Sequence, residues 1–228
     1  MIEQPDDEAV KLYYETLAPE YDRSRFNNSY GRYIDTQERE ILNRWLVSEN
    51  KSVLDLACGT GRFLSLATAG LDLSANMLEV ARGKYPEKLL IHASADDIPI
   101  ESGTYDAVFA LHLFMHLSKA KIEAIVNECY RILRPNGVFI FDIPSALRRK
   151  LISYKADSWH GATSFSIDDI RAICTHQWEL EELIGVLFFP IHRLPPQVRN
   201  LVLRVDKIIC SSLLKSMSSY YMVKLVKR

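Results

Sequence analysis

A short glycine-containing segment, residues 53–62, carries the residue types that point most directly to ligand binding. It reads Val-Leu-Asp-Leu-Ala-Cys-Gly-Thr-Gly-Arg, an apolar run followed by a turn with glycines at positions 59 and 61. Glycine permits a sharp turn and leaves no Cβ in the way of a ligand that approaches the main chain. A strand, a glycine loop and a helix in succession hold nucleotide-like cofactors in doubly wound α/β proteins. The dinucleotide fingerprint is absent, because Leu64 stands where its third glycine would fall, and no Walker lysine follows.

The apolar pattern around this loop predicts alternating strands and helices, which form a mostly parallel sheet with helices on both faces. We therefore expect a doubly wound α/β fold. Strands are expected at residues 52–56, 71–73, 89–92, 105–111, 138–142, 178–182 and 220–226. Helices or helical turns are expected at residues 8–23, 34–46, 62–67, 75–84, 119–133, 167–174 and 197–211, with Ser74, Ser118 and Ser166 as N-caps. The irregular, apolar segments 144–166 and 185–196 are natural places for a substrate lid.

Residues 55–62, Asp-Leu-Ala-Cys-Gly-Thr-Gly-Arg, resemble motif I of the class I, small-molecule S-adenosylmethionine-dependent methyltransferases. Four more segments resemble later motifs of that family in the right order: residues 71–78, 95–100, 105–108 and 130–137. The resemblance is strong over residues 53–142 and looser elsewhere. It implies a seven-stranded, Rossmann-like sheet with an antiparallel last strand. It also implies S-adenosylmethionine as the cofactor and S-adenosylhomocysteine as the product.

Asp72 is the sharpest single candidate for cofactor binding. It ends the second expected strand, where a carboxylate can accept hydrogen bonds from both hydroxyls of a ribose. The alternative is a cap on the next helix, a role that Ser74 already fills. By resemblance, Asp55 organises the glycine loop, and Leu73 and Met77 pack on the adenine. The expected cofactor-binding set is Tyr14, Tyr21, Asp55, Ala57, Gly59, Thr60, Gly61, Asp72, Leu73, Met77, Ser94, Ala95, Asp96 and Leu111.

The residue that accepts a hydrogen bond from the adenine amino group is left open by the sequence. Many relatives carry an Asp just ahead of the adenine loop, and Ser94 occupies that position here. Asp96 or Asp97 could substitute from nearby, and Ala95 would contribute its backbone N–H. The alternative is that these two carboxylates belong to a solvated acidic loop.

Aromatic residues near the start of the chain resemble the N-terminal element that closes over the cofactor in small-molecule methyltransferases. These are Tyr13, Tyr14 and the pair Tyr21-Asp22. The resemblance implies that a tyrosine reaches the carboxylate tail of the cofactor. The alternative is a surface helix packed by its aromatic side chains.

His112 and His116 are the candidate catalytic residues. They follow the fourth expected strand, and Asp142 ends the fifth, so all three lie where open α/β sheets bind ligands. An imidazole is suited to take a proton near neutral pH. A packing or hydrogen-bonding role is the alternative for each histidine. No metal is expected, because no third ligand stands out beside the two histidines.

Composition indicates an ordinary globular protein and bounds its organisation. The 228 residues are 48% hydrophobic and 25% charged, with a net charge of -1, so nothing overall steers the chain to nucleic acid. We expect a single domain, 1–228, with an N-terminal helical cap (1–50), a cofactor-binding core (51–143) and substrate-side and C-terminal elements (144–228). Four scattered cysteines and an acidic, polar start favour a cytoplasmic location.

The C-terminal segment is rich in basic and apolar residues. From Leu183 onward it carries eight Lys or Arg side chains, and Asp206 is its only acid. It could meet an anionic or lipophilic acceptor or a membrane surface, although stable insertion is not expected. The alternative is a helix packed on the sheet with solvated cations. The sequence does not predict an oligomeric state.

The motifs together favour methyl transfer to the oxygen, nitrogen or carbon of a small molecule. Most of the catalysis can come from holding donor and acceptor in line. Two alternatives stay open at this stage: a nicotinamide-dependent oxidoreductase on a similar fold, and a non-catalytic cofactor-binding protein.

Overall fold

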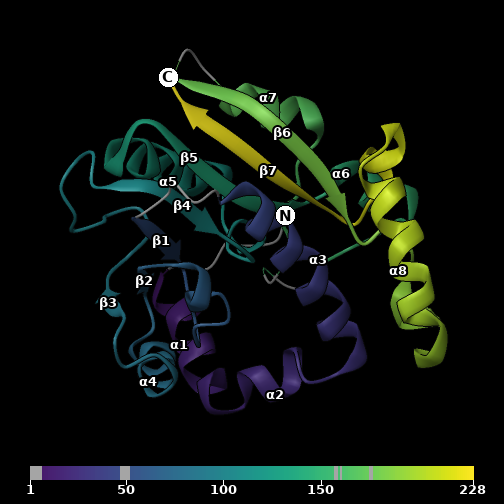
Figure 1. The fold of residues 1–228 in the computed structure, drawn as a ribbon, viewed down its shortest axis with the longest axis horizontal. Coiled ribbons are helices and arrows are strands. Elements are labelled where there is room, and N and C mark those ends of the chain that lie inside the picture. The colour runs from purple at the N-terminus through teal and green to yellow at the C-terminus, as the bar shows by residue number, and fades with distance from the viewer. Residues whose placement is uncertain (1–6, 47–51, 157–158, 160, 175–176) are drawn as a thin grey trace.

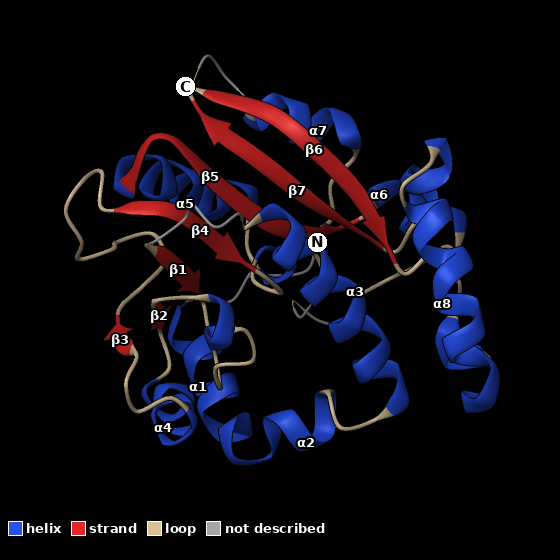
Figure 2. Ribbon diagram, viewed as in Figure 1, coloured by secondary structure: helices blue, strands red, loops and turns tan. Residues whose placement is uncertain are grey.

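The computed structural model describes residues 7–46, 52–156, 159, 161–174 and 177–228, and these residues form a single mixed sheet with helices on both sides (Figures 1 and 2). The strand order is β3-β2-β1-β4-β5-β7-β6. Strand β7 is antiparallel to both β5 and β6, whereas the pairs among β1 to β5 are parallel. The predicted doubly wound, seven-stranded sheet is confirmed. The strands are β1 (Val53–Leu56), β2 (Ala69–Asp72), β3 (Leu89–His92), β4 (Tyr105–Ala110), β5 (Leu133–Pro144), β6 (Trp178–Val186) and β7 (Tyr220–Lys227).

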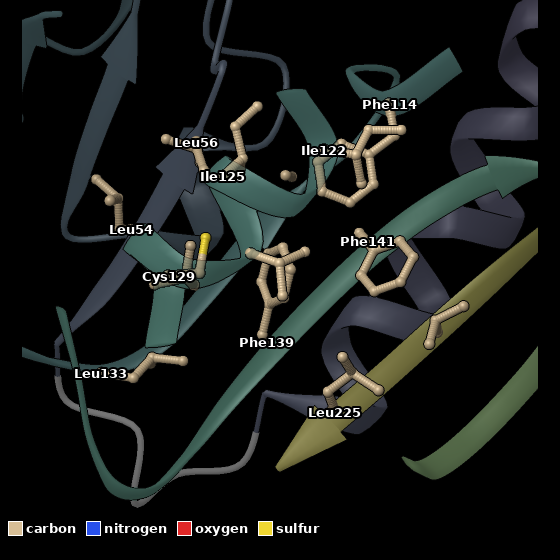
Figure 3. Close-up of a cluster of buried hydrophobic side chains, with 14 of the residues drawn as sticks. Leu54, Leu56, Phe114, Ile122, Ile125, Cys129, Leu133, Phe139, Phe141 and Leu225 are labelled. Carbon is tan, nitrogen blue, oxygen red and sulfur yellow. The ribbon is translucent and has the colours of Figure 1, made fainter. Parts of the chain in front are cut away.

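Alternate residues of the central strands enter two different cores, because successive side chains point to opposite faces of a sheet. Leu54 and Val108 belong to the core on the side of α5 and α7, where Phe139 and Phe141 also pack (Figure 3). Their neighbours Val53, Ala107 and Phe109 belong to the other core, together with side chains of α3 and α4. The two buried cores fix the carboxyl ends of the parallel strands at one edge of the sheet.

The helices begin largely where the sequence predicts. Ser74 and Ser118 each accept a hydrogen bond from the backbone N–H three residues on, and Ser166 forms a capping box with Asp169. Helix α1 and the turn after it pack against α4, so the N-terminal helices lie beside the first half of the sheet. The helices are α1 (Asp7–Leu17), α2 (Tyr21–Arg25), α3 (Ser29–Trp45), α4 (Ala75–Lys84), α5 (Lys119–Ile132), α6 (Ala146–Leu151), α7 (Ile167–Ile173) and α8 (Pro196–Cys210).

Several elements differ in type or extent from the expectations. Residues 62–67 form only a single 3-10 turn, Leu64–Leu66, so no α-helix opens behind the glycine loop. The segment 144–166, expected to be irregular, contains helix α6, which Ser145 caps and whose Ala, Leu, Arg and Lys residues favour helix. Strand β6 also continues to Val186, into the second segment expected to be irregular. In the described part of the chain, each helix is too short or too polar to cross a bilayer.

Candidate functional site

A pocket lies at the carboxyl ends of the parallel strands, where the sequence places the site. Its empty space, including the open mouth, is about 1130 Å³. Two of the expected site residues, Gly61 and Asp96, do not line it. The expected residues that do line it are Tyr14, Tyr21, Asp55, Ala57, Gly59, Thr60, Asp72, Leu73, Met77, Ser94, Ala95, Leu111, His112 and His116.

The two glycines of the loop serve different purposes. Gly59 has a φ of +54°, and a Cβ added there would meet nothing within 4 Å, because the residue faces the open pocket. Gly61 has a φ of +84°, and an added Cβ would lie 2.9 Å from Cδ1 of Leu64 and 3.3 Å from Cβ of Ala81. The absence of a Cβ at Gly61 therefore lets the loop pack tightly against Leu64 and against Ala81 of α4. Gly61 does not line the pocket.

Asp72 links the glycine loop to the start of α4. One carboxylate oxygen accepts a hydrogen bond from the Gly59 N–H at 2.7 Å, and the other accepts from the Ser74 N–H at 2.8 Å. Each oxygen keeps a second lone pair, so the carboxylate can still accept from a ligand hydroxyl. Burial raises the pKa of Asp72, although the Ser74 and Gly59 amides oppose that rise.

Asp55 is a buried carboxylate that lacks one hydrogen-bond partner among the described residues. It is buried beneath the loop, and its Oδ2 has no hydrogen-bond partner within the described chain. Burial raises its pKa well above the ordinary range, with Arg62 opposing and Asp72 adding to the rise. An unpaired buried carboxylate oxygen is costly, so a cationic or hydrogen-bonding group of a ligand would satisfy it. The residues present therefore fit a ligand that carries an amino group and ribose hydroxyls.

The N-terminal helices are fastened over the loop through Asp22. The Thr60 hydroxyl donates to one Asp22 oxygen at 2.6 Å, and Lys84 forms an ion pair with the other. Lys84 also donates to the Thr60 carbonyl at 2.8 Å. Tyr14 and Tyr21 line the pocket from this element, and burial raises the pKa of both phenols. We call the N-terminal helices α1 and α2 the N-terminal cover. Asp22 thus joins this cover to the glycine loop and to α4.

Ser94 and Ala95 line the pocket, whereas Asp96 does not. Asp96 accepts a hydrogen bond from Ser94 and pairs with Lys121 at 2.6 Å. Partial burial opposes the shift, but Lys121 and Ser94 together lower the pKa of Asp96. Lys121 lines the pocket and is a site residue that sequence reasoning missed.

His112 lines the pocket directly after β4. Its φ is +60°, a strained value for a residue with a side chain, and such strain is concentrated at functional sites. Its backbone N–H donates to Oδ1 of Asp142 at 2.6 Å. Its Nε2 lies 2.8 Å from Oε1 of Glu38, and its Nδ1 lies 3.9 Å from Oδ2 of Asp142. The imidazole is held between two buried carboxylates.

Glu38, His112 and Asp142 shift one another's pKa values. Burial opposes ionisation of Glu38, but His112 and Arg62 outweigh it and lower the pKa of Glu38 to about 2. Burial by itself would lower the pKa of His112, but Glu38 and Asp142 raise it above its ordinary value of 6.5. Burial raises the pKa of Asp142, while His112 opposes that rise. His112 consequently retains its proton to a higher pH than a free imidazole.

Glu38 is the principal residue that sequence reasoning missed. A signal was present, because Glu38 falls on the apolar stripe of α3 at helical spacing from Ile34, Leu42 and Trp45, all buried. The neighbouring Arg62 lies 2.7 Å from Glu38, and its guanidinium stacks 4.0 Å from the ring centroid of Phe26. A charged residue on a buried stripe needs a partner, which marks it as a candidate site residue.

Glu38, His112 and Asp142 also satisfy the spacing of a metal site, since one ligand atom from each lies within 4.8 Å of the others. This cluster contains His112 but not His116, so it is a different set from the pair of histidines considered in the sequence. Arg62 already neutralises Glu38 at 2.7 Å, and a cation in the cluster would be repelled by it.

His116 does not share the surroundings of His112. It is buried, and its Nδ1 accepts a hydrogen bond from the Gly161 N–H at 3.0 Å. Its ring lies 5.8 Å from that of Trp159 and 6.0 Å from that of Tyr14. It also lines the pocket, and these contacts fit the packing role that the sequence left as an alternative.

Comparison with known proteins relates the central part of the chain to methyltransferases. The family model described as a methyltransferase domain matches residues 54–141. An uncharacterized protein of Methanocaldococcus jannaschii is 32% identical over 136 residues, which cover 59% of this chain and 51% of that protein. A demethylmenaquinone methyltransferase of Geobacillus is 31% identical over 151 residues, which cover 59% of this chain and 62% of that protein. The chain thus spans roughly half to three-fifths of the length of these curated relatives.

Solved structures support the fold assignment. A SAM-dependent methyltransferase from Thermotoga maritima has a TM-score of 0.72 at 21% identity, covering 94% of this chain and 98% of that one. Residues 54–141 thus match a methyltransferase domain, and the structural likeness shows that the chain shares the fold of a SAM-dependent methyltransferase.

Proposed function

We propose that the protein transfers a methyl group from S-adenosylmethionine to a small-molecule acceptor and releases S-adenosylhomocysteine. The proposal rests on one observation. The same pocket is lined by residues suited to binding a cofactor and by a histidine suited to accepting a proton. On one side lie the glycine loop, Asp72 and the unpaired Oδ2 of Asp55. On the other side His112 stands between Glu38 and Asp142. The first side suits a cationic nucleoside, and the second suits removal of a proton from an acceptor.

The cofactor-binding roles follow the contacts of each residue. Asp72 would accept from the ribose hydroxyls while it holds Gly59, and Asp55 would accept from the amino group of the methionine tail. Leu73 and Met77 would pack on the adenine, and Ser94 and Ala95 would meet its edge, since all four line the pocket. When bound, the cofactor supplies an electrophilic methyl group on a sulfonium.

His112 would act as the general base. Its Nε2 lies 2.8 Å from Oε1 of Glu38, and Nδ1 would be the atom that takes the proton. An acceptor O–H or N–H would give its proton to Nδ1 as its oxygen or nitrogen bonds to the methyl carbon. Glu38 fixes the ring and stabilises the imidazolium that results, and Asp142 holds the backbone of His112 in its strained conformation.

The surroundings of His112 favour a lipophilic acceptor. Its ring lies 6.4 Å from the rings of both Phe26 and Tyr220. Burial raises the pKa of Tyr220, so the phenol stays neutral beside the imidazole. The Geobacillus relative is named for demethylmenaquinone, a lipophilic substrate, and this agrees with the aromatic walls. We also propose a cytoplasmic location, which the four scattered cysteines favour.

Calorimetry and a transfer assay test the proposal together. The chain should bind S-adenosylhomocysteine and not a nicotinamide dinucleotide, whose fingerprint lacks its third glycine here. Incubation with methyl-labelled S-adenosylmethionine and a metabolite pool should then label an acceptor. Binding of nicotinamide dinucleotide instead would indicate an oxidoreductase. Cofactor binding without transfer to any fraction of the pool would indicate a non-catalytic protein.

A further inference from the structure

Exposed apolar side chains gather at one end of the molecule. Among the described residues, ten of the twelve large apolar side chains with high exposure lie in residues 147–154 and 198–214. Leu213 is 96% exposed, Leu201 is 76% exposed and Ile208 is 71% exposed. Concentration of this kind marks an interaction site, whereas scattered apolar residues do not. The ten residues are Leu147, Leu151, Ile152, Tyr154, Val198, Leu201, Val205, Ile208, Leu213 and Leu214.

These residues form one continuous surface, which we call the basic apolar surface. The 3-10 turn Leu213–Met217 packs against both α6 and α8 and so joins the two segments. Figure 1 shows α6 and α8 at the same end of the sheet, where β6 ends. This end is opposite to β3, because β3 and β6 form the two edges of the sheet.

The apolar stripe of α8 points outward because the opposite side of the helix is anchored. Asp206 is fully buried, and it accepts hydrogen bonds from Nε2 of Gln37 at 2.6 Å and from the Phe189 N–H at 2.8 Å. Val198, Leu201, Val205 and Ile208 lie at helical spacing away from this anchor and are exposed. The helix is therefore fixed with an apolar face toward solvent.

The exposed charged side chains of the basic apolar surface are positive. Residues 145–156 contain four Lys or Arg side chains and no acid, and residues 191–217 contain five and only the buried Asp206. Lys150, Lys155, Arg193 and Arg204 are exposed among the apolar side chains. Apolar residues interleaved with cations on a fixed helix are typical of segments that lie in the interface of a membrane.

We propose that the basic apolar surface docks on an anionic lipid surface. A second copy of this chain is a poorer occupant, because a two-fold interface would bring the same cations together without an exposed acid to pair them. A nucleic acid would match the charge, but the exposed side chains are mainly leucine, isoleucine and valine rather than stacking aromatics. Anionic headgroups above a hydrocarbon layer satisfy both the cations and the aliphatic side chains.

The docking surface adjoins the acceptor side of the pocket. Tyr220 follows the turn Leu213–Met217 closely in the chain, and its ring lies 6.4 Å from that of His112. Docking would thus place the acceptor side near the lipid. The docking itself does not depend on the proposed methyl transfer, and its test uses no turnover.

Vesicle flotation of the full chain tests the docking. Wild type should float with vesicles of phosphatidylcholine mixed with phosphatidylglycerol and remain in solution with phosphatidylcholine alone. The double variant Leu201→Gln/Ile208→Gln should lose on the order of tenfold in partitioning. Arg204→Gln combined with Lys150→Gln should weaken binding, and added salt should weaken it further. The matched control Leu12→Gln/Leu89→Gln alters side chains 66% and 61% exposed outside the surface and should float as wild type does.

Three results would overturn the proposal. The first is that wild type does not bind anionic vesicles, and the second is that Leu201→Gln/Ile208→Gln binds as well as wild type. The third is a dimer by sedimentation that the same double variant dissociates, which would make this face an interface between copies. Thermal melts of each variant exclude unfolding as the cause of any loss.

Discussion

The Nε2 atom of His112 lies 2.8 Å from Oε1 of Glu38, so the turn after β4 and helix α3 share one buried ion pair. Glu38 is in turn 2.7 Å from Arg62, which belongs to the glycine loop. The acceptor side and the cofactor side of the pocket are therefore coupled through a single carboxylate. Replacement of that carboxylate should alter the chemistry of His112 more than the fold.

Glu38→Gln should move the pH dependence of turnover. Neutral His112 is the base in the proposed reaction, so the rate should rise as pH rises through its pKa, which lies above 6.5 in the wild type. Loss of the Glu38 charge removes the main factor that raises this pKa, so the rise should move to lower pH. Maximal turnover should fall by about tenfold or more, because the imidazolium loses its stabilising partner. A pH–rate profile and an NMR titration of His112 measure both effects.

The matched control is Glu40→Gln on the same helix. Glu40 pairs with Lys207 at 2.5 Å, outside the pocket lining, so its variant should keep the wild-type profile. If Glu38→Gln leaves the titration of His112 unchanged, the carboxylate does not control the base.

His112→Ala should lower turnover, whereas His116→Ala should lower stability. Removal of the proposed base should lower turnover roughly a hundredfold with little change in affinity for S-adenosylhomocysteine. Removal of the His116 ring should leave the buried Gly161 N–H without an acceptor and cost about 1–3 kcal/mol of stability. Single-turnover rates, calorimetry and thermal melts distinguish the two. Equal turnover of His112→Ala and wild type would leave proximity alone as the catalytic effect.

The sequence predicts the sheet and the cofactor side of the pocket well, because both depend on local patterns. Alternating apolar strands and Ser74 as a helix cap are readable from neighbouring residues. Glu38 is different, since its partner His112 is distant in sequence and only the packing of α3 brings them together. Helix α6 was missed because its short run of residues has no clear apolar period.

Asp72→Ala should weaken cofactor binding. Loss of a charged acceptor for two hydroxyls costs on the order of 1.5–3 kcal/mol, about ten- to a hundredfold in affinity. The Gly59 and Ser74 amides would lose their acceptor as well, so the loop should also loosen. Asp72→Asn keeps one acceptor oxygen and should fall between wild type and alanine. Calorimetry with S-adenosylhomocysteine measures the series, and unchanged affinity in the folded alanine variant would refute the ribose role.

Gly59→Ala and Gly61→Ala should separate binding from stability. A Cβ at Gly59 enters the open pocket, so affinity for S-adenosylhomocysteine should fall while the melting temperature changes little beyond the strain of a positive φ. A Cβ at Gly61 would lie 2.9 Å from Leu64, so the melting temperature should fall first. Calorimetry and thermal melts on both variants test the distinction. The reverse pattern would mean that Gly61 carries the ligand contact.

Asp22→Asn should loosen the N-terminal cover. The variant keeps an acceptor for the Thr60 hydroxyl but loses the charge that pairs with Lys84. Since this contact is partly exposed, the ion pair alone contributes little, and the effect should come from a cover that opens more often. Affinity for S-adenosylhomocysteine should fall by about three- to tenfold, mainly through faster dissociation. Hydrogen exchange in α1 and α2 should accelerate, whereas exchange in β4 should not.

Glu20→Gln is the matched control for that variant. Glu20 lies in the same N-terminal element but pairs only with the exposed Arg23, so its loss should change neither affinity nor exchange. Tyr14 and Tyr21 line the pocket from this element, and a looser cover should expose both rings. Their fluorescence should then become more accessible to a soluble quencher in Asp22→Asn and remain unchanged in Glu20→Gln. If ligand dissociation and exchange match wild type in Asp22→Asn, the cover is held by its aromatic packing, and Asp22 serves only to shape the glycine loop.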